Sequence, residues 1–119
     1  MIELGPGQLV GLGGAGGALL RYLISEGFRS HEYPYGTFAV NVLGSFLLGF
    51  ATFSGVGGDT GLLVGTGMLG AFTTFSSFSF ETVRLWETGE RREAIVNLVG
   101  TFGVASLAVG LAWLAATAF

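Results

Sequence analysis

The sequence predicts an all-α membrane protein built from four transmembrane helices. Half of its 119 residues are hydrophobic, only 11% are charged, and lysine is absent. Soluble domains carry roughly 25% charged residues, so this chain lacks the polar side chains that a water-facing surface needs. Four apolar stretches, at about 7–28, 35–53, 61–80 and 94–119, have the roughly 20 residues that a helix needs to cross a bilayer. We therefore expect a single domain over residues 1–119, lying in the cell (plasma) membrane as a multi-pass protein.

Short polar segments separate these stretches. Residues 26–34 carry charges and a proline, which predicts a loop, and residues 54–60 form a glycine-rich turn. Residues 81–93 are the most charged segment of the chain. We expect them to extend the third span before the chain turns at Gly89.

The composition excludes several classes of function. The chain has no cysteine and only one histidine, His31, which excludes disulfides, thiolate metal sites and all-histidine metal sites. A net charge of −3 provides no basic patch for nucleic acid. No plausible nucleophile–base or metal arrangement is present, so the chain is not predicted to be an enzyme.

The first span combines small residues with one charge. Gly13 and Gly17 have the spacing that lets helix backbones approach closely in lipid, and Gly61 and Gly65 repeat it in the third span. Tight helix packing is the expected result. Arg21 lies near the end of the first span, where it either extends to the membrane surface or supplies an anion-attracting charge at a vestibule.

The second span contains an amide. Asn41 offers two N–H donors, and Thr37 and Ser45 lie one turn before and after it on the same helix face. Two interpretations stay open at this point. The amide either bridges two helices as a structural element or lines a polar pathway.

The third span is the most informative segment. Residues 70–80 contain five hydroxyl side chains and four phenylalanines. An unpaired hydroxyl in an apolar medium costs about 2–7 kcal/mol, so these groups are not expected to face lipid. At helical spacing the side chains of this segment form three stripes. One contains Phe72, Phe75 and Phe78, the second contains Thr74 and Ser77, and the third contains Ser76 and Ser79. A pathway for a small anion uses both the hydroxyl donors and the positive edges of the rings.

The same segment predicts a helix break. Serine and threonine compete for backbone hydrogen bonds, and glycines precede them, so we expect a break near Gly70 to Phe75. Irregular backbone at membrane depth is tolerated only where it is buried or lines a cavity. Its free carbonyls are suited to hold a cation.

At these residues the chain resembles a known family. The pattern G-x-x-T-T-F-S-x-F-S over residues 70–79 resembles the signature of the Fluc fluoride channels, also called CrcB. Residues 16–22, Gly-Gly-Ala-Leu-Leu-Arg-Tyr, and the glycine- and asparagine-containing run 36–46 resemble the family's first-span and second-span motifs. The resemblance covers nearly the whole chain, and the third-span motif is highly specific.

The resemblance implies a fluoride channel that exports fluoride passively. Members are antiparallel, dual-topology dimers of four-span subunits with two fluoride pores, and a structural sodium ion lies on the dimer axis. By motif position the sodium is held by the backbone carbonyls of Gly70 and Thr73. The fluoride pathway would then include Asn41, Phe75, Phe78, Thr74, Ser77 and Ser79.

Two features depart from the family pattern. The fourth span carries Asn97, Thr101, Phe102 and Ser106, and their roles are not assigned by the resemblance. All five arginines also belong to one side of the membrane or its adjacent span ends, which predicts a preferred orientation. An antiparallel dimer then forms either from this chain alone or with an oppositely oriented paralogue.

Two other functions compete. A small cation exporter needs a membrane-embedded carboxylate, but Glu3 lies at the terminus and Glu81 closes the third span. A purely structural membrane subunit would leave the hydroxyl and phenylalanine pattern without a purpose. Both alternatives are therefore less favoured than the channel.

Overall fold

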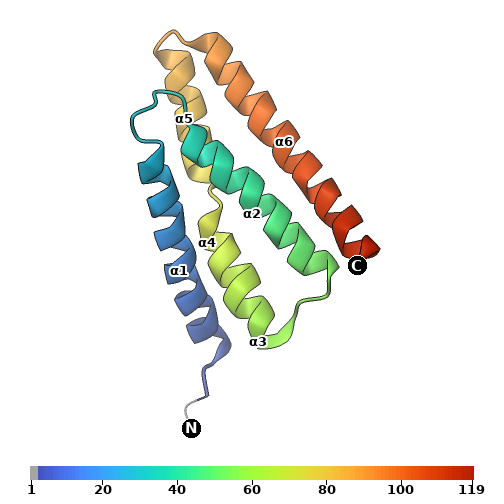
Figure 1. The fold of residues 1–119 in the computed structure, drawn as a ribbon. Helices are drawn as coiled ribbons and strands as arrows, with labels where there is room; N and C mark the ends of the chain where they lie inside the picture. Colours follow the sequence, from blue (N-terminus) through green and yellow to red (C-terminus); the bar gives the residue numbers. More distant parts are fainter. Residues whose placement is uncertain (1–2) are drawn as a thin grey trace.

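The computed structural model describes residues 3–119, and within that range every regular element is a helix (Figure 1). This confirms the all-α class. The run that contains the third predicted span is divided into four elements, three of which precede the break and follow one another without interruption. The elements are α1 (Pro6–Gly27), α2 (Tyr35–Phe53), α3 (Gly58–Thr60), η1 (Gly61–Leu69), α4 (Gly70–Phe72), α5 (Phe75–Glu87) and α6 (Arg91–Ala118).

Three helical runs are long and apolar enough to cross a membrane. Among the described residues they are α2, the composite run Gly58–Glu87 and α6. The chain is therefore a multi-pass membrane protein. Helix α1 has 22 residues but does not belong to this set. It contains Gln8 and Arg21, and its many glycines contribute little hydropathy.

The helices alternate in direction (Figure 1). Helix α1 packs along η1 and α4, and α2 packs along α6. The turn after α2 and both described ends of the chain lie at one end of the molecule. The loop after α1 and the turn between α5 and α6 lie at the other, and Gly89 in that turn has a φ of +91°. The arginines accordingly gather toward one end, as the sequence predicted.

One of the two glycine pairs mediates close packing. A Cβ atom on Gly13 would overlap the carbonyl of Leu63, and one on Gly17 would overlap the carbonyl of Met68. The backbones of α1 and η1 therefore touch, which confirms the prediction for this pair. The pair Gly61 and Gly65 makes no comparable approach, since the nearest atom to a Cβ on Gly65 would be Leu48 Cδ1 at 3.9 Å.

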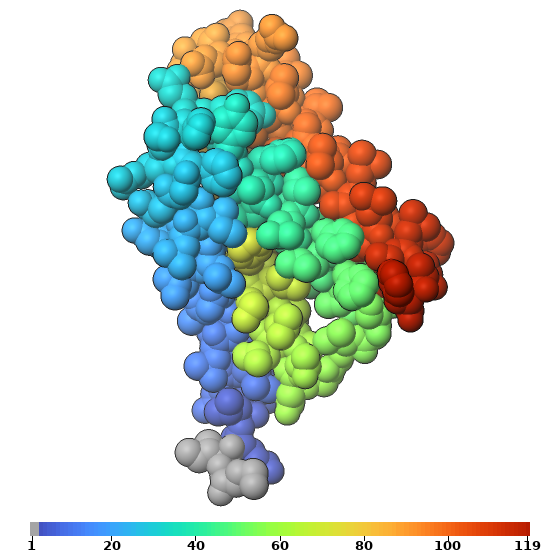
Figure 2. All heavy atoms as spheres, in the orientation of Figure 1, coloured from blue at the N-terminus to red at the C-terminus, as the bar shows by residue number. Residues whose placement is uncertain are grey.

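The first half of the third span is wound as a π-helix. The N–H of Gly70 bonds to the carbonyl of Gly65, five residues earlier. Glycine-rich sequence permits this wider winding because few side chains crowd the backbone. Where η1 begins, it diverges from the end of α2 and leaves a hollow of about 430 Å³ (Figure 2).

The interior of the described chain is small. Val40, Asn97 and Ala112 are fully buried, whereas many large apolar side chains point outward, including Leu19, Leu107 and Leu111. A water-soluble protein would not expose so many of them, but lipid solvates them without cost. Polar side chains are instead among the buried residues, and they surround the helix break.

Candidate functional site

The third span breaks at two consecutive threonines. Helix α4 ends at Phe72 and α5 begins at Phe75, while Thr73 and Thr74 have extended backbone angles. The break lies inside the window that the sequence predicted. The Thr74 hydroxyl accepts the N–H of Ser77 at 3.1 Å and so caps the start of α5.

Asn41 on α2 holds the break in place. Its Oδ1 accepts the N–H of Thr74 at 2.7 Å, and its Nδ2 donates to the carbonyl of Thr74 at 2.9 Å. The Asn41 side chain therefore bridges two helical segments, as the structural interpretation of this amide predicted. The second N–H on Nδ2 has no hydrogen-bond partner among residues 3–119, and Asn41 also lines the cavity beside the break.

That cavity has a volume of about 270 Å³ and opens at the surface of the chain. Phe75 and Phe102 are 79% and 72% exposed at its edge, whereas Phe78 is buried. The Phe75 and Phe78 rings lie 6.0 Å apart between centroids at an angle of 51°. The lining residues come from α2, the break, α5 and α6, and they are Asn41, Ser45, Thr73, Thr74, Phe75, Phe78, Thr101, Phe102 and Ala105.

The predicted site residues divide into two groups. The structure brings Asn41, Thr74, Phe75 and Phe78 together around this cavity. Three others lie outside its lining and are partly buried elsewhere, namely Ser77, Ser79 and Arg21. Phe102, which the sequence marked without a role, contributes an aromatic ring from α6.

The break also leaves the last carbonyls before it, those of Gly70 and Thr73 among them, without their helical donors. In a continuous helix the Gly70 carbonyl would accept the N–H of Thr74, and the Thr73 carbonyl would accept that of Ser77. Instead the Thr74 N–H bonds to Asn41, and the Ser77 N–H bonds to the Thr74 hydroxyl. The Thr73 hydroxyl lies 3.5 Å from the Gly70 oxygen, which is a weak contact. Carbonyl oxygens released in this way suit a hard cation such as sodium.

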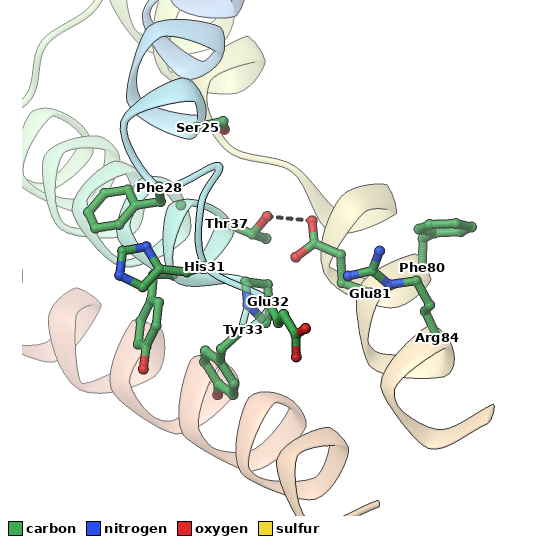
Figure 3. A pocket seen from close by; sticks show the side chains of 12 residues that line it. Ser25, Phe28, His31, Glu32, Tyr33, Thr37, Phe80, Glu81 and Arg84 are labelled. Carbon is green, nitrogen blue, oxygen red and sulfur yellow. Dashed lines mark hydrogen bonds between the residues drawn. The ribbon is translucent and has the colours of Figure 1, made fainter. Parts of the chain in front are cut away.

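A second polar pair lies one helical turn from Asn41. The Thr37 hydroxyl donates to Glu81 Oε1 at 2.7 Å (Figure 3). The other carboxylate oxygen, Oε2, is buried without a hydrogen-bond partner in the described chain. From the sequence, Glu81 was expected only to close the third span. Its position two helical turns after Thr74 was the signal that could have placed it on the same side of the helix as the break.

Thr37 and Glu81 line a cavity of about 280 Å³ between the loop after α1 and helix α5 (Figure 3). Aromatic side chains of the loop surround it, and His31 meets Tyr35 edge-on at 5.2 Å between centroids. Burial raises the pKa of the Tyr33 phenol, and the nearby Tyr35 and Glu93 act in the same direction. The Tyr33 phenol therefore keeps its proton to a higher pH than an ordinary tyrosine does.

Two of the fourth-span polar residues, Asn97 and Thr101, belong to a buried network, whereas Ser106 is exposed. Asn97 is fully buried, and its Nδ2 donates to the Thr82 hydroxyl at 2.8 Å. Thr82 donates to the carbonyl of Phe78 at 2.8 Å, and Thr101 donates to Asn97 Oδ1 at 3.3 Å. The spacing of Asn97 and Thr101 predicted a shared face. It did not reveal that this face packs against α5.

Comparison with known proteins identifies the family. Residues 8–115 match the family model described as CrcB-like protein, Camphor Resistance (CrcB). The chain belongs to the CrcB family. A relative from Haloarcula marismortui named fluoride-specific ion channel FluC 2 is 52% identical over 95% of each chain. FluC 1 proteins from Halobacterium salinarum and Geobacillus kaustophilus are 48% and 45% identical, over 92% and 88% of this chain and 92% and 90% of their own.

Membership in the CrcB family confirms the resemblance that the motifs of the three spans indicated. The named relatives are ion channels rather than enzymes, in agreement with the prediction that this chain is not an enzyme. Their names also argue against the cation exporter and the structural subunit. The matched region contains the entire third-span motif and both Asn41 and Asn97.

Proposed function

We propose that this protein is a fluoride-selective ion channel that lets cytoplasmic fluoride leave passively down its electrochemical gradient. The observation that supports it most directly is the cavity at the helix break, where an amide, hydroxyls and three phenylalanine rings meet. Relatives that are about half identical to this chain are named as fluoride-specific channels.

The chemistry of the cavity suits a small, strongly hydrated anion. Fluoride loses water only if other donors replace it, because burial of a bare ion costs tens of kcal/mol. The second Asn41 N–H and the hydroxyls of Thr74 and Thr101 are such donors, and phenylalanine edges carry partial positive charge. Of the predicted hydroxyls Thr74, Ser77 and Ser79, only Thr74 lines the cavity itself, and the other two lie on α5 outside its lining.

Selectivity and direction follow from the same features. A narrow pathway favours fluoride over the larger chloride by size. The sequence contains no nucleotide-binding motif, so the flow is passive, and a negative cell interior drives an anion outward. Arg21 would attract anions to a vestibule at the end of α1.

The assembly completes the pathway. We propose that α1 is the fourth transmembrane helix and that two subunits pack antiparallel in the plasma membrane, surrounded by lipid. The exposed Phe75 and Phe102 at the cavity edge then face the second subunit. Such a dimer contains two pores. The second subunit is another copy of this chain or an oppositely oriented paralogue.

We further propose that a sodium ion stabilises the dimer. The carbonyls of Gly70 and Thr73 from both subunits would hold it, because the break leaves these oxygens without their helical donors. The ion would supply positive charge that fixes the two breaks against each other.

Fluoride efflux from proteoliposomes tests the function. The purified chain should release fluoride much faster than chloride, and Phe75→Ile or Phe78→Ile should reduce fluoride efflux. Phe50→Ile is a matched control, because Phe50 stacks on Phe46 of the same helix and lies outside the cavity lining. Equal fluoride and chloride release, or unchanged efflux in both cavity variants, would refute the proposal.

A further inference from the structure

A row of three hydrogen bonds, one buried and two partly buried, leads away from the cavity, and all of its protons point the same way. Thr101 donates to Asn97, Asn97 donates to Thr82, and Thr82 donates to the carbonyl of Phe78. Thr101 lines the cavity, yet its O–H is directed away from the cavity toward Asn97. At rest, the Thr101 side chain therefore presents no hydroxyl proton to an entering anion.

We propose that Asn97 is a positioning residue that holds the Thr101 hydroxyl proton while the cavity is empty and yields it when an anion arrives. The inference rests on the proposed function, since it concerns how the cavity receives the ion. No covalent bond changes in this step. The hydroxyl turns about its Cβ–Oγ1 bond, gives up the Asn97 acceptor and donates to the anion.

The lengths of the three hydrogen bonds support this exchange. The bond from Thr101 to Asn97 is 3.3 Å, whereas the other two are 2.8 Å. A longer hydrogen bond is weaker, and one to an anion is stronger than one to a neutral amide oxygen. Thr101 is therefore the link that an anion can break, while the two shorter bonds keep Asn97 in place.

The empty cavity explains why an acceptor is needed. Thr101 is 4% exposed and Asn97 is fully buried. A buried hydroxyl without a partner is unfavourable, so a donor reserved for the ion needs a resting partner. The Oδ1 of Asn97 provides this partner, and it is fixed because the amide also donates to Thr82 on α5.

The test compares three substitutions in the full chain, reconstituted in liposomes, with fluoride efflux and melting temperature measured for each. Thr101→Val removes the donor and should lower efflux at least about tenfold, the effect of losing one hydrogen bond to a charged group. Thr101→Ser keeps the hydroxyl and should restore efflux. Thr117→Val makes the same isosteric change on helix α6, at a hydroxyl that donates to the carbonyls of Trp113 and Leu114 and lies outside the cavity lining, so it should leave efflux within about twofold.

Asn97→Leu adds a measurement that distinguishes positioning from a purely structural role, namely the dependence of efflux on fluoride concentration. In this variant the Thr101 hydroxyl has no Asn97 acceptor to give up. An anion therefore binds the hydroxyl without the loss of a hydrogen bond and is held more tightly. Both the half-saturating fluoride concentration and the maximal efflux rate should fall. If Asn97→Leu does not fold, the Thr101 and Thr117 variants still test the hydroxyl donor on which the inference depends.

Two results would overturn the inference alone. They are equal losses of efflux in Thr101→Val and Thr117→Val, and wild-type efflux in Thr101→Val. In both cases the unsubstituted chain still conducts fluoride, so the proposed function survives. A chain that conducts no fluoride at all would instead refute the proposed function and this inference with it.

Discussion

Asn41 and Thr74 are joined by two hydrogen bonds, one in each direction, with lengths of 2.7 and 2.9 Å. An interruption in a membrane helix leaves backbone groups that lipid cannot satisfy. The Asn41 amide supplies a donor and an acceptor to the residue where the interruption occurs. The second N–H on its nitrogen remains for the cavity. One side chain therefore stabilises the break and supplies a donor to the site that the break creates.

Replacing Asn41 by leucine should destabilise the protein as well as stop conduction. The substitution leaves the N–H and carbonyl of the buried Thr74 without partners, at about 1–3 kcal/mol for each group. We expect a lower melting temperature in detergent and fluoride efflux at background level. Ser45→Ala, one turn away on the same helix, is the matched control and should change the melting temperature little. An unchanged melting temperature in Asn41→Leu would show that the two bonds do not hold the break.

The contact between α1 and η1 makes a prediction about stability alone. A methyl group on Gly17 would overlap the carbonyl of Met68, so Gly17→Ala should cost about 1–3 kcal/mol through overpacking. Gly11→Ala on the same helix is the control, because nothing lies within 4 Å of its added Cβ. Thermal unfolding of the two purified variants checks this. Equal melting temperatures would mean that α1 is not packed against η1 in the membrane.

These glycines also show how far the sequence alone can lead. The spacing of Gly13 and Gly17 predicted a close helix approach, and the structure contains it. The identical spacing of Gly61 and Gly65 predicted the same approach, which is absent there. The spacing of two glycines shows that a helix has a face without side chains, but not whether another helix packs against that face. The break was predictable because its causes, hydroxyl side chains next to glycines, are local.

Partners distant in sequence were not predictable. Thr37 and Glu81 are 44 residues apart, and Asn97 and Thr82 are 15 apart on separate helices. Each residue alone has several possible partners, and the choice depends on how far each helix is rotated about its axis. The π-helical winding of η1 contributes to that rotation, and no pattern in the sequence indicated it.

Removing sodium should lower the stability of the assembled protein. An ion bound only to the folded state stabilises it by about 2.7 kcal/mol at a hundred times its dissociation constant. The melting temperature in sodium chloride should therefore exceed that in N-methylglucamine chloride at equal ionic strength. Potassium chloride serves as a second comparison for the size of the ion. Identical melting in all three salts would exclude the sodium ion that we propose at Gly70 and Thr73.

The arginine distribution predicts one preferred orientation in the membrane. The loop after α1 and the turn after α5 lie at the arginine-bearing end of the chain, whereas the turn after α2 has no arginine. Lysine and arginine are retained on the cytoplasmic side during insertion. The end with the turn after α2 should therefore face outward in most copies.

Single cysteines can report that orientation without background, because the chain has no cysteine of its own. Val56→Cys, in the turn after α2, should react with a membrane-impermeant maleimide in intact cells. Ser30→Cys, in the loop after α1, should react only after the membrane is permeabilised. Such a bias means that an antiparallel partner must come from an oppositely oriented paralogue. Equal labelling of both positions in intact cells, together with robust fluoride efflux from this chain alone, would instead establish a homodimer inserted in both directions.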